Sequence, residues 1–519
     1  MKRDFSALAG CQFDLLVCGG GIYGAWTAYD AALRGLRVAI VEQGDWAQAT
    51  SSASSKLIHG GLRYLETWDF KLVKKALVER SRLLSNAPHR VWPLRFGIPL
   101  YPESRIGHLQ LKAGLMLYDF LGGNLRSALR HNHFGRKTFS LYFPALDEAM
   151  LQGGFTYTDA QTDDARLVLE LIAGAMAAGA VCVNYCQLKS SVEKRGSVYH
   201  ATVCDQTNNS EAAIITKQLV YATGQWMVNA TEAKTACRLT KGVHLVLPAV
   251  LQDQALLLTA PSDGRVFFML PWYGRTLLGT TDTDYHGAAG QVTVEEADVT
   301  YLLDAANYYL KTGWTAADII NSYAGVRVLK NNGSVHPSAV SRDWELKTAA
   351  NGTHYSIGGK ITSAREDAAV IVDTVCSQLG LSQPCLTRTQ MFPWSPQDFT
   401  QWTTHQKAQA KKIGLAEDIA LWLMRRYGKR VEEVFSVLST DPHLATRIVP
   451  TLPFILADLL CCARQEMVVH LSDLLRRRMP LLILAQLTAT ELRPLAGLVA
   501  PVLGWDEARI NDEVFHCHL

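Results

Sequence analysis

Three glycines near the start of the chain have the spacing of a phosphate-binding turn. Gly19, Gly21 and Gly24 follow an apolar run, Phe13 to Cys18, of the kind that forms a strand buried on both faces of a parallel sheet. In this G-x-G-x-x-G pattern the first glycine permits a tight turn, the second lets the backbone approach a pyrophosphate, and the third lets the next helix pack on the strand. The N-terminus of that helix would attract the anion through its free N–H groups and its dipole.

The acidic residue Glu42 stands where a ribose would bind. The helix is expected to end at Gly35, and a second apolar strand, Leu36 to Val41, carries Glu42 at its tip. A carboxylate there can accept hydrogen bonds from both ribose hydroxyls and disfavours a 2′-phosphate, which argues against NADP. Strand, helix, strand and acid together predict a dinucleotide-binding unit, and these residues leave NAD and FAD open.

The next segment distinguishes between NAD and FAD as the cofactor. Gln48 to Glu66 reads QATSSASSKLIHGGLRYLE, in which Lys56, His59 and Arg63 are set among small hydroxyl residues and glycines. A nicotinamide enzyme would usually continue with another strand and helix. A loop of this kind could instead wrap a large cofactor and reach its reactive end.

From Thr50 to Glu66 the sequence matches without interruption the signature of the FAD-dependent glycerol-3-phosphate dehydrogenases. The resemblance covers nearly the whole chain. The further matches are Asp163-Asp164-Ala165-Arg166-Leu167, Ala222-Thr223-Gly224, Gly279-Thr280-Thr281-Asp282, Gly325-Val326-Arg327, Ser341-Arg342-Asp343 and Gly358-Gly359-Lys360-Ile361-Thr362. This resemblance implies an α/β fold with a Rossmann-like FAD-binding domain of the two-dinucleotide-binding, D-amino-acid-oxidase-like type, an antiparallel-sheet substrate domain and a C-terminal helical domain.

The resemblance also implies which residues contact FAD. They are Gly19, Gly21, Gly24, Glu42, Thr50, Ser51, Ser54, Ser55, Lys56, Leu57, His59, Gly61, Ala222, Thr223, Gly224, Gly325, Gly359, Lys360, Ile361 and Thr362.

A phosphorylated, dianionic substrate requires fixed cations, and the planar fork of arginine suits phosphate oxygens. By the resemblance, Arg63, Tyr64 and Arg342 would bind the phosphate end, and Arg327 the substrate hydroxyls. Lys360 would lie near the N1 and N5 edge of the flavin, where it could stabilise charge on the reduced ring.

His59 is the first candidate for the general base. Its imidazole can take a hydroxyl proton near neutral pH, and it shares a loop with Arg63. The alternative is that His59 only donates a hydrogen bond to the flavin and moves no proton. The sequence leaves both roles open.

At 519 residues the chain is long enough for two or three domains. We expect an oxidoreductase domain over residues 1–390, with FAD-binding parts at about 1–75, 150–238 and 319–385 and substrate-binding parts at about 76–149 and 239–318. Within the latter, Arg265 to Tyr285 reads as two antiparallel strands around a turn at Tyr273-Gly274. Residues 391–519 are expected to form the helical domain, with Arg476 to Arg478 on a solvated helix face.

Composition narrows the class of protein. A net charge of +3 offers no global argument for nucleic acid, and no nucleic-acid-binding motif occurs. The 11 cysteines are irregularly spaced and are expected to be reduced, without a zinc site or any other metal site. The N-terminus does not read as a signal peptide, and Pro480 to Leu503 reads as buried helices rather than a membrane span. A cytoplasmic enzyme is expected, and a homodimer is left open.

One segment suggests contact with a membrane surface. Between His89 and Lys137 there are eight Lys or Arg residues and two acids, interleaved with leucines. A basic amphipathic helix can lie in the interface of an anionic membrane, but it can equally pack on its own protein with a solvated basic face. The resemblance favours the first option, because bacterial members of the family are peripheral membrane enzymes that pass electrons to quinone.

Three positions depart from the family pattern. Gln225 and Val328 replace prolines, and Val243 replaces a serine. These changes leave the FAD site largely untouched but keep a related hydroxy-phosphate open as the substrate.

The expected activity is oxidation of sn-glycerol 3-phosphate to dihydroxyacetone phosphate, with reoxidation of the reduced flavin by membrane quinone. An oxidase that uses oxygen would share every one of these motifs. A non-catalytic flavoprotein is disfavoured, because it would not need the four cationic residues Arg63, Arg327, Arg342 and Lys360.

Overall fold

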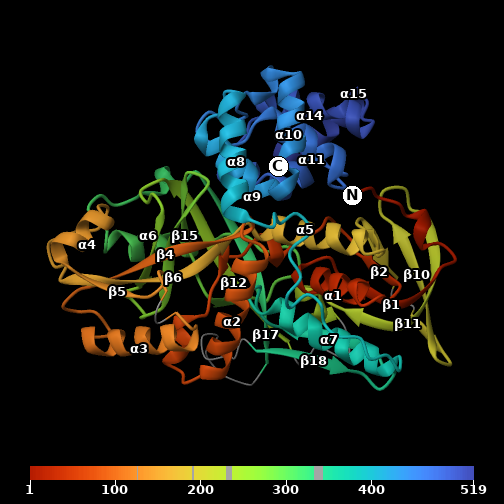
Figure 1. The fold of residues 1–519 in the computed structure, drawn as a ribbon, viewed down its shortest axis with the longest axis horizontal. Helices are drawn as coiled ribbons and strands as arrows, with labels where there is room; N and C mark the ends of the chain where they lie inside the picture. The colour runs from red at the N-terminus through yellow and green to blue at the C-terminus, as the bar shows by residue number, and fades with distance from the viewer. Residues whose placement is uncertain (125–126, 190–191, 230–236, 332–342, 519) are drawn as a thin grey trace.

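The computed structural model describes residues 1–124, 127–189, 192–229, 237–331 and 343–518, arranged as two sheets with a layer of C-terminal helices above them (Figure 1). The strand order of the first sheet is β18-β19-β11-β1-β2-β7, and β10 adds to β11 with β8 and β9 beyond it. Its strands are β1 (Gln12–Cys18), β2 (Val38–Val41), β7 (Val181–Val183), β8 (Cys186–Leu188), β9 (Glu193–Arg195), β10 (Val198–Asp205), β11 (Glu211–Tyr221), β18 (Trp344–Thr348) and β19 (His354–Gly358).

The parallel strands of this sheet bury apolar runs under three helices. These are α1 (Ile22–Leu33), α5 (Asp164–Ala177) and α7 (Ala364–Gln378), which share one core with β1 and β2. β1 pairs in parallel with β2 and β11, as the predicted βαβ unit requires. α1 ends two residues before Gly35, whose φ of +84° lets the chain turn back toward β2.

The second sheet is mostly antiparallel, in the order β16-β12-β15-β14-β13-β4-β6-β3, with β17 beside β12 and β5 beside β6. Its strands are β3 (Leu57–Ile58), β4 (Val91–Leu100), β5 (Asn132–Gly135), β6 (Gly153–Thr162), β12 (Cys237–Pro248), β13 (Gln254–Thr259), β14 (Val266–Trp272), β15 (Arg275–Gly279), β16 (Thr283–Asp284) and β17 (Asn321–Lys330). Around it lie α2 (Phe70–Asn86), α3 (His108–Leu121), α4 (Arg136–Tyr142) and α6 (Glu296–Asn307). The predicted turn at Tyr273-Gly274 joins β14 to β15.

Two strands within the predicted FAD-binding ranges join the second sheet. β6 and β17 lie in the ranges 150–238 and 319–385, and both pair with strands of the second sheet. β6 pairs with β4 along its whole length, and β17 pairs with β12 from Asn321 to Lys330. Their apolar residues satisfy either sheet equally well, and only the antiparallel partners decide which one they join.

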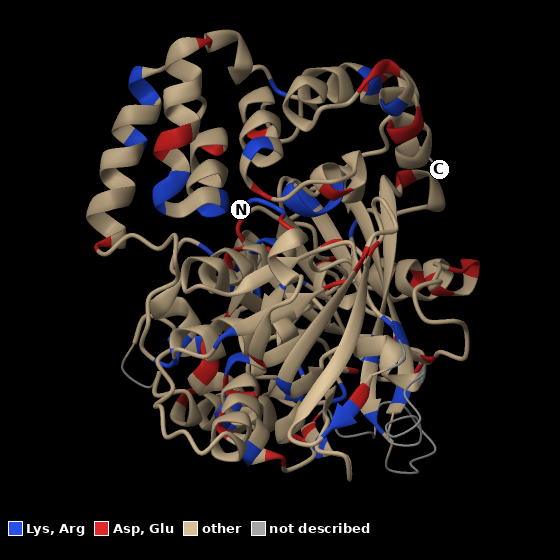
Figure 2. Ribbon diagram, turned by 90° about the vertical axis from the view of Figure 1, so that its right-hand side faces the viewer, with Lys and Arg blue, Asp and Glu red and all other residues tan. Residues whose placement is uncertain are grey.

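The C-terminal domain is helical, as predicted. It contains α8 (Phe399–Lys412), α9 (Glu417–Tyr427), α10 (Val431–Thr440), α11 (Leu456–Gln465), α12 (Leu471–Asp473), α13 (Leu481–Leu484), α14 (Ala489–Leu503) and α15 (Glu507–His518). The N-terminus lies at its junction with the rest of the molecule, and acidic and basic residues are interspersed along the ribbon (Figure 2). Among the described residues no helix combines the length and apolar character needed to cross a bilayer.

The prediction of a solvated arginine face at residues 476–478 is wrong. Arg477 is 5% exposed and Arg478 is fully buried, and both pair with Asp45 of the first domain. A basic triplet on a helix looks the same in sequence whether it faces water or a buried carboxylate.

Candidate active site

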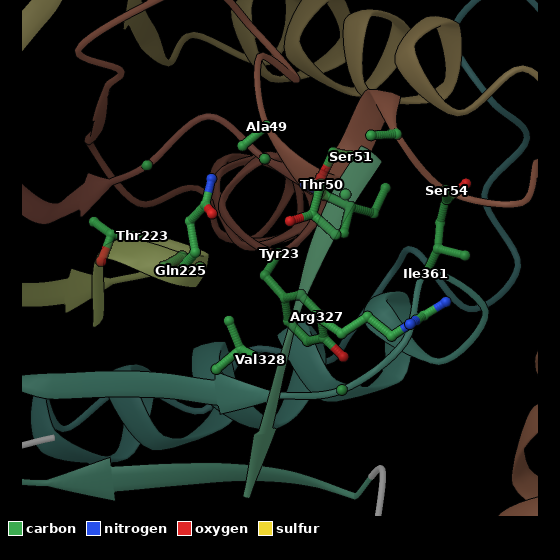
Figure 3. Close-up of a pocket in the computed structure, with 18 of the residues that line it drawn as sticks. Tyr23, Ala49, Thr50, Ser51, Ser54, Thr223, Gln225, Arg327, Val328 and Ile361 are labelled. Atoms are coloured by element: carbon green, nitrogen blue, oxygen red, sulfur yellow. Dashed lines mark hydrogen bonds between the residues drawn. The ribbon is translucent and has the colours of Figure 1, made fainter. Parts of the chain in front are cut away.

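A cavity of about 850 Å³ lies between the two sheets. Its walls come from the glycine turn, the loop after β2, the end of β11, strands β12 and β17, and the turn after β19. Figure 3 shows Thr50 and Ser51 on one side of this space and Thr223, Gln225 and Arg327 around it. These segments are hundreds of residues apart in sequence, so the fold assembles the site.

Most predicted cofactor residues line this cavity. The lining includes Gly19, Gly21, Glu42, Thr50, Ser51, Ser54, Ser55, Leu57, His59, Ala222, Thr223, Gly224, Gly325, Gly359, Lys360, Ile361 and Thr362. Gly24, Lys56 and Gly61 lie outside the described lining.

The glycine turn has the geometry that the motif requires. A Cβ on Gly19 would stand 2.5 Å from the carbonyl oxygen of Ala222, and one on Gly24 would stand 1.8 Å from the carbonyl oxygen of Gly19. Gly24 therefore acts by letting α1 pack against the turn, rather than by contact with a ligand. Gly21 caps the N-terminus of α1, where the N–H of Ile22 donates to Ser51 Oγ at 2.9 Å.

Glu42 is held in place by the backbone. One carboxylate oxygen accepts from the N–H of Gly20 at 2.6 Å, and the other accepts from the N–H of Gly44 at 2.9 Å. Burial raises the pKa of this carboxyl, while the two N–H donors oppose that shift. The side chain borders the cavity at the tip of β2, the position expected for a ribose ligand.

Lys56 has a structural role that the sequence did not reveal. Its side chain is 1% exposed, and its ammonium lies 2.8 Å from Asp164 Oδ1 and also donates to the carbonyl of Ser52. Asp164 in addition accepts from the N–H and the hydroxyl of Ser54. This ion pair fastens the cofactor loop to the start of α5, so the ammonium of Lys56 anchors the loop, and the predicted part of Lys56 in cofactor binding stays a prediction.

Arg327 reaches the cavity from β17. Its guanidinium donates to Thr280 Oγ1 at 2.8 Å and lies 3.3 Å from Asp282 Oδ1. The group packs over Gly242, where a Cβ would stand 2.3 Å from Nη2. The fork is therefore oriented by the G-T-T-D segment before a substrate arrives.

Lys360 and Tyr64 lie together at another wall of the cavity. The ammonium of Lys360 is 3.8 Å from the centre of the Tyr64 ring, and its backbone N–H donates to the hydroxyl of Tyr23 at 2.9 Å. Arg63, in the same turn as Tyr64, is half-buried and outside the described lining. Arg342 lies outside the residues that the structure describes.

Two histidines border the cavity. His59, the predicted base, has its backbone N–H bonded to Thr362 Oγ1 and its ring near Phe268. His244 on β12 was missed by sequence reasoning. Its Nε2 lies 2.9 Å from Ser55 Oγ, and its ring stacks on Tyr323.

His244 is held in its neutral form. Burial holds its pKa well below the ordinary range, and the charges of Arg327 and Lys56 lower the pKa further. Its Nδ1 has no hydrogen-bond partner among the described residues. The signal available in the sequence was a polar residue within the apolar run Val243 to Leu247, next to the departure at Val243.

The three departures from the family pattern fall in different places. Gln225 and Val328 line the cavity, and Gln225 is 4% exposed. Val243 points into the apolar core behind β12 and is fully buried. The first two changes therefore touch the ligand space, whereas the third does not.

These features fit FAD. The turn between Gly19 and Gly21 leaves room for phosphates at a helix N-terminus, Glu42 is placed for ribose hydroxyls, and the cavity is large enough for a dinucleotide together with a small substrate. Fold and site together define an FAD-dependent oxidoreductase.

Comparison with known proteins agrees with this assignment to the FAD-dependent oxidoreductases. Residues 14–365 match the model of the FAD dependent oxidoreductase family, and residues 388–510 match that of the C-terminal domain of alpha-glycerophosphate oxidase. The chain is 34% identical over 517 residues to glycerol-3-phosphate dehydrogenase 2 of Mycobacterium tuberculosis, covering 97% of this chain and 87% of that protein. It is also 34% identical over 486 residues to the aerobic glycerol-3-phosphate dehydrogenase of Staphylococcus aureus, covering 90% and 86%.

The solved structures point the same way. The glycerol-3-phosphate dehydrogenase of Bacillus halodurans, complexed with FAD, superimposes with a TM-score of 0.79 at 28% identity and covers 98% of this chain and 95% of its own. An L-alpha-glycerophosphate oxidase from Mycoplasma pneumoniae, at 18% identity and a TM-score of 0.56, covers 74% of this chain and all of its own and shares the fold alone. This chain belongs to the FAD-dependent glycerol-3-phosphate dehydrogenase family.

Proposed function

We propose that this enzyme oxidises sn-glycerol 3-phosphate to dihydroxyacetone phosphate and that its electrons pass to a membrane quinone. The observation that carries the proposal is the meeting of Arg327, Lys360 and two histidines at one cofactor-sized cavity. A small anionic alcohol needs such a set of cations and bases. The similar dehydrogenases of Mycobacterium tuberculosis and Staphylococcus aureus are named for the same substrate.

Each residue has a proposed role. FAD, when bound, is the acceptor of the two electrons that leave the substrate carbon. Arg327 orients the substrate hydroxyls, and Tyr64 and Lys360 border the remainder of the substrate space. Arg63 and Arg342 are proposed at the phosphate end. His244 or His59 takes the hydroxyl proton, and His244 has the advantage of being held neutral by burial.

The visible flavin spectrum tests this proposal. The purified protein is mixed anaerobically with glycerol 3-phosphate, and rapid bleaching is expected. A yellow protein that bleaches with a different hydroxy-phosphate would correct the substrate, and a protein that takes up no FAD would overturn the assignment. Single substitutions His59→Asn and His244→Asn then identify the base as the residue whose loss abolishes bleaching while flavin stays bound.

The outer face of α3 supports the membrane part of the proposal. Leu111, Leu115 and Tyr118, which an amphipathic helix could have turned to lipid, are buried in the protein core. The outward stripe instead carries Leu109 and Phe120, which are 80% and 65% exposed. Exposed Met116 and Lys112 lie between them along the same face. An apolar stripe with a cation suits an anionic bilayer.

Vesicle flotation tests this face. Binding to anionic vesicles should fall sharply in the variant Leu109→Glu/Phe120→Glu, while flavin bleaching is unchanged. Phe515→Glu is the matched control, because Phe515 is 61% exposed on α15. Equal binding by both variants would remove α3 from the membrane contact.

An oxygen-using oxidase is the second candidate. It is favoured by the match of residues 388–510 to a domain described from an alpha-glycerophosphate oxidase. Reoxidation of the bleached enzyme separates the two activities: a soluble quinone should restore the yellow colour much faster than dissolved oxygen. Faster reoxidation by oxygen, with release of peroxide, would establish the oxidase.

A further inference from the structure

The loop after β2 is held by the C-terminal helical domain. Asp45 follows Glu42 by three residues and is fully buried. Its Oδ2 accepts from Arg477 Nε at 2.5 Å and from the guanidinium of Arg478. Asp45 Oδ1 accepts from the amide of Asn184 at 3.1 Å.

The two arginines are themselves fixed within the C-terminal domain. Arg477 Nη2 donates to Asp473 Oδ1 at 2.6 Å, and Arg478 Nη2 donates to the carbonyl of Glu466 at 2.7 Å. Arg477 and Arg478 are the last two residues of a π-helical turn, Leu474–Arg478. In this turn the two consecutive side chains both reach the carboxylate of Asp45. Two buried cations therefore meet two buried carboxylates, Asp45 and Asp473.

The same loop forms the underside of the glycine turn. Trp46 is fully buried beneath Gly20, where a Cβ would stand 2.4 Å from Trp46 Cε3. The N–H of Ala47 donates to the carbonyl of Gly20 at 3.0 Å, and the N–H of Gly20 donates to Glu42 at 2.6 Å. Trp46 Nε1 in turn points to Met467 Sδ of the C-terminal domain at 3.3 Å.

We infer that Arg477 and Arg478 are positioning residues for FAD. By clamping Asp45 they hold Trp46 under the glycine turn and keep Glu42 at the ribose position, so the C-terminal domain completes the cofactor site without touching the cofactor. The inference concerns FAD binding and is independent of which substrate is oxidised.

Affinity of the apoprotein for FAD tests the inference. Flavin is removed, and the protein is titrated with FAD while the quenching of flavin fluorescence is followed. Arg478→Gln should raise the dissociation constant by about tenfold or more, since residues in one network couple at this level. The matched control is Arg426→Gln, because Arg426 is equally buried and pairs with Asp458, inside the C-terminal domain. The control should bind FAD as the parent does.

The remaining readouts separate positioning from general damage. FAD-saturated Arg478→Gln should keep the parental KM for glycerol 3-phosphate, and Arg478→Lys, which keeps the charge, should retain part of the FAD affinity that Arg478→Gln loses. Asp45→Asn provides the same test from the other side of the contact if Arg478→Gln does not fold. Unchanged FAD affinity in Arg478→Gln or in Asp45→Asn, or an equal loss in Arg426→Gln, would overturn the inference.

Discussion

The ammonium of Lys360 lies 3.8 Å from the centre of the Tyr64 ring, which joins the first and last motifs of the site. A cation over an aromatic face is worth about 0.5–2 kcal/mol, depending on its exposure to water. The contact fixes the turn after β19 against η3 (Leu62–Leu65), and both border the cavity that Arg327 reaches from the other sheet. This part of the site is thus formed where three separate segments meet, namely η3, β17 and the turn after β19.

Arg327→Ala should retain bound flavin but lower the rate of substrate reduction by about a hundredfold or more, the usual cost of removing one charge-stabilising donor. Anaerobic stopped-flow bleaching measures this rate. Arg238→Ala is a suitable control, because Arg238 pairs with Asp284 on the neighbouring strands and lies outside the described lining. Undiminished bleaching in Arg327→Ala would remove this residue from the substrate site.

Lys56→Met should lower the free energy of unfolding by about 3–5 kcal/mol, because it leaves the buried carboxylate of Asp164 without its cation. Urea unfolding of the apoprotein measures the change without a contribution from the cofactor. The double variant Lys56→Met/Asp164→Asn should regain part of the loss, since no buried charge remains uncompensated. If Lys56→Met alters FAD affinity and leaves apoprotein stability unchanged, the anchoring role is wrong.

His244 should make the protein less stable in acid. Its folded-state pKa is lowered, so below the unfolded value of about 6.5 the unfolded chain binds the proton first. Stability from this group is complete above pH 6.5 and is lost as pH falls, by up to about 1.4 kcal/mol per pH unit. His244→Gln should therefore show a shallower decline than the parent in urea unfolding between pH 7 and pH 5. Identical slopes would contradict the assignment.

Gln225 should contact the cofactor. Its side chain is 4% exposed at the cavity wall, and its Oε1 has no hydrogen-bond partner among the described residues. Since a hydrogen bond contributes about 0.5–1.5 kcal/mol, Gln225→Leu, which keeps the size but not the amide, should weaken FAD binding roughly two- to tenfold. Fluorescence titration measures this affinity. Gln225→Pro, the residue usual in the family, shows whether a changed backbone compensates, and parental affinity in Gln225→Leu would exclude the contact.

The βαβ unit, the glycine turn and the position of Glu42 at the tip of β2 were all open to prediction from the sequence. They depend on local spacing: an apolar run, glycines at fixed offsets, and an acid at a strand tip. The same holds for the hairpin of β14 and β15. The motif residues Thr50, Arg327 and Lys360 were also found correctly at the cavity, because the resemblance to a known family carries positional information that a single sequence does not.

Only the tertiary structure decided which side chains are buried and which residues they contact. Lys56 and Arg478 look like ligand-binding or solvated cations in sequence, yet each is buried against a carboxylate from a distant segment. His244 becomes a candidate base because Ser55 and Tyr323 surround it. The sheet to which β6 and β17 belong was likewise set by their antiparallel partners. Burial and charge pairing arise from contacts hundreds of residues apart, and periodicity along the chain does not encode them.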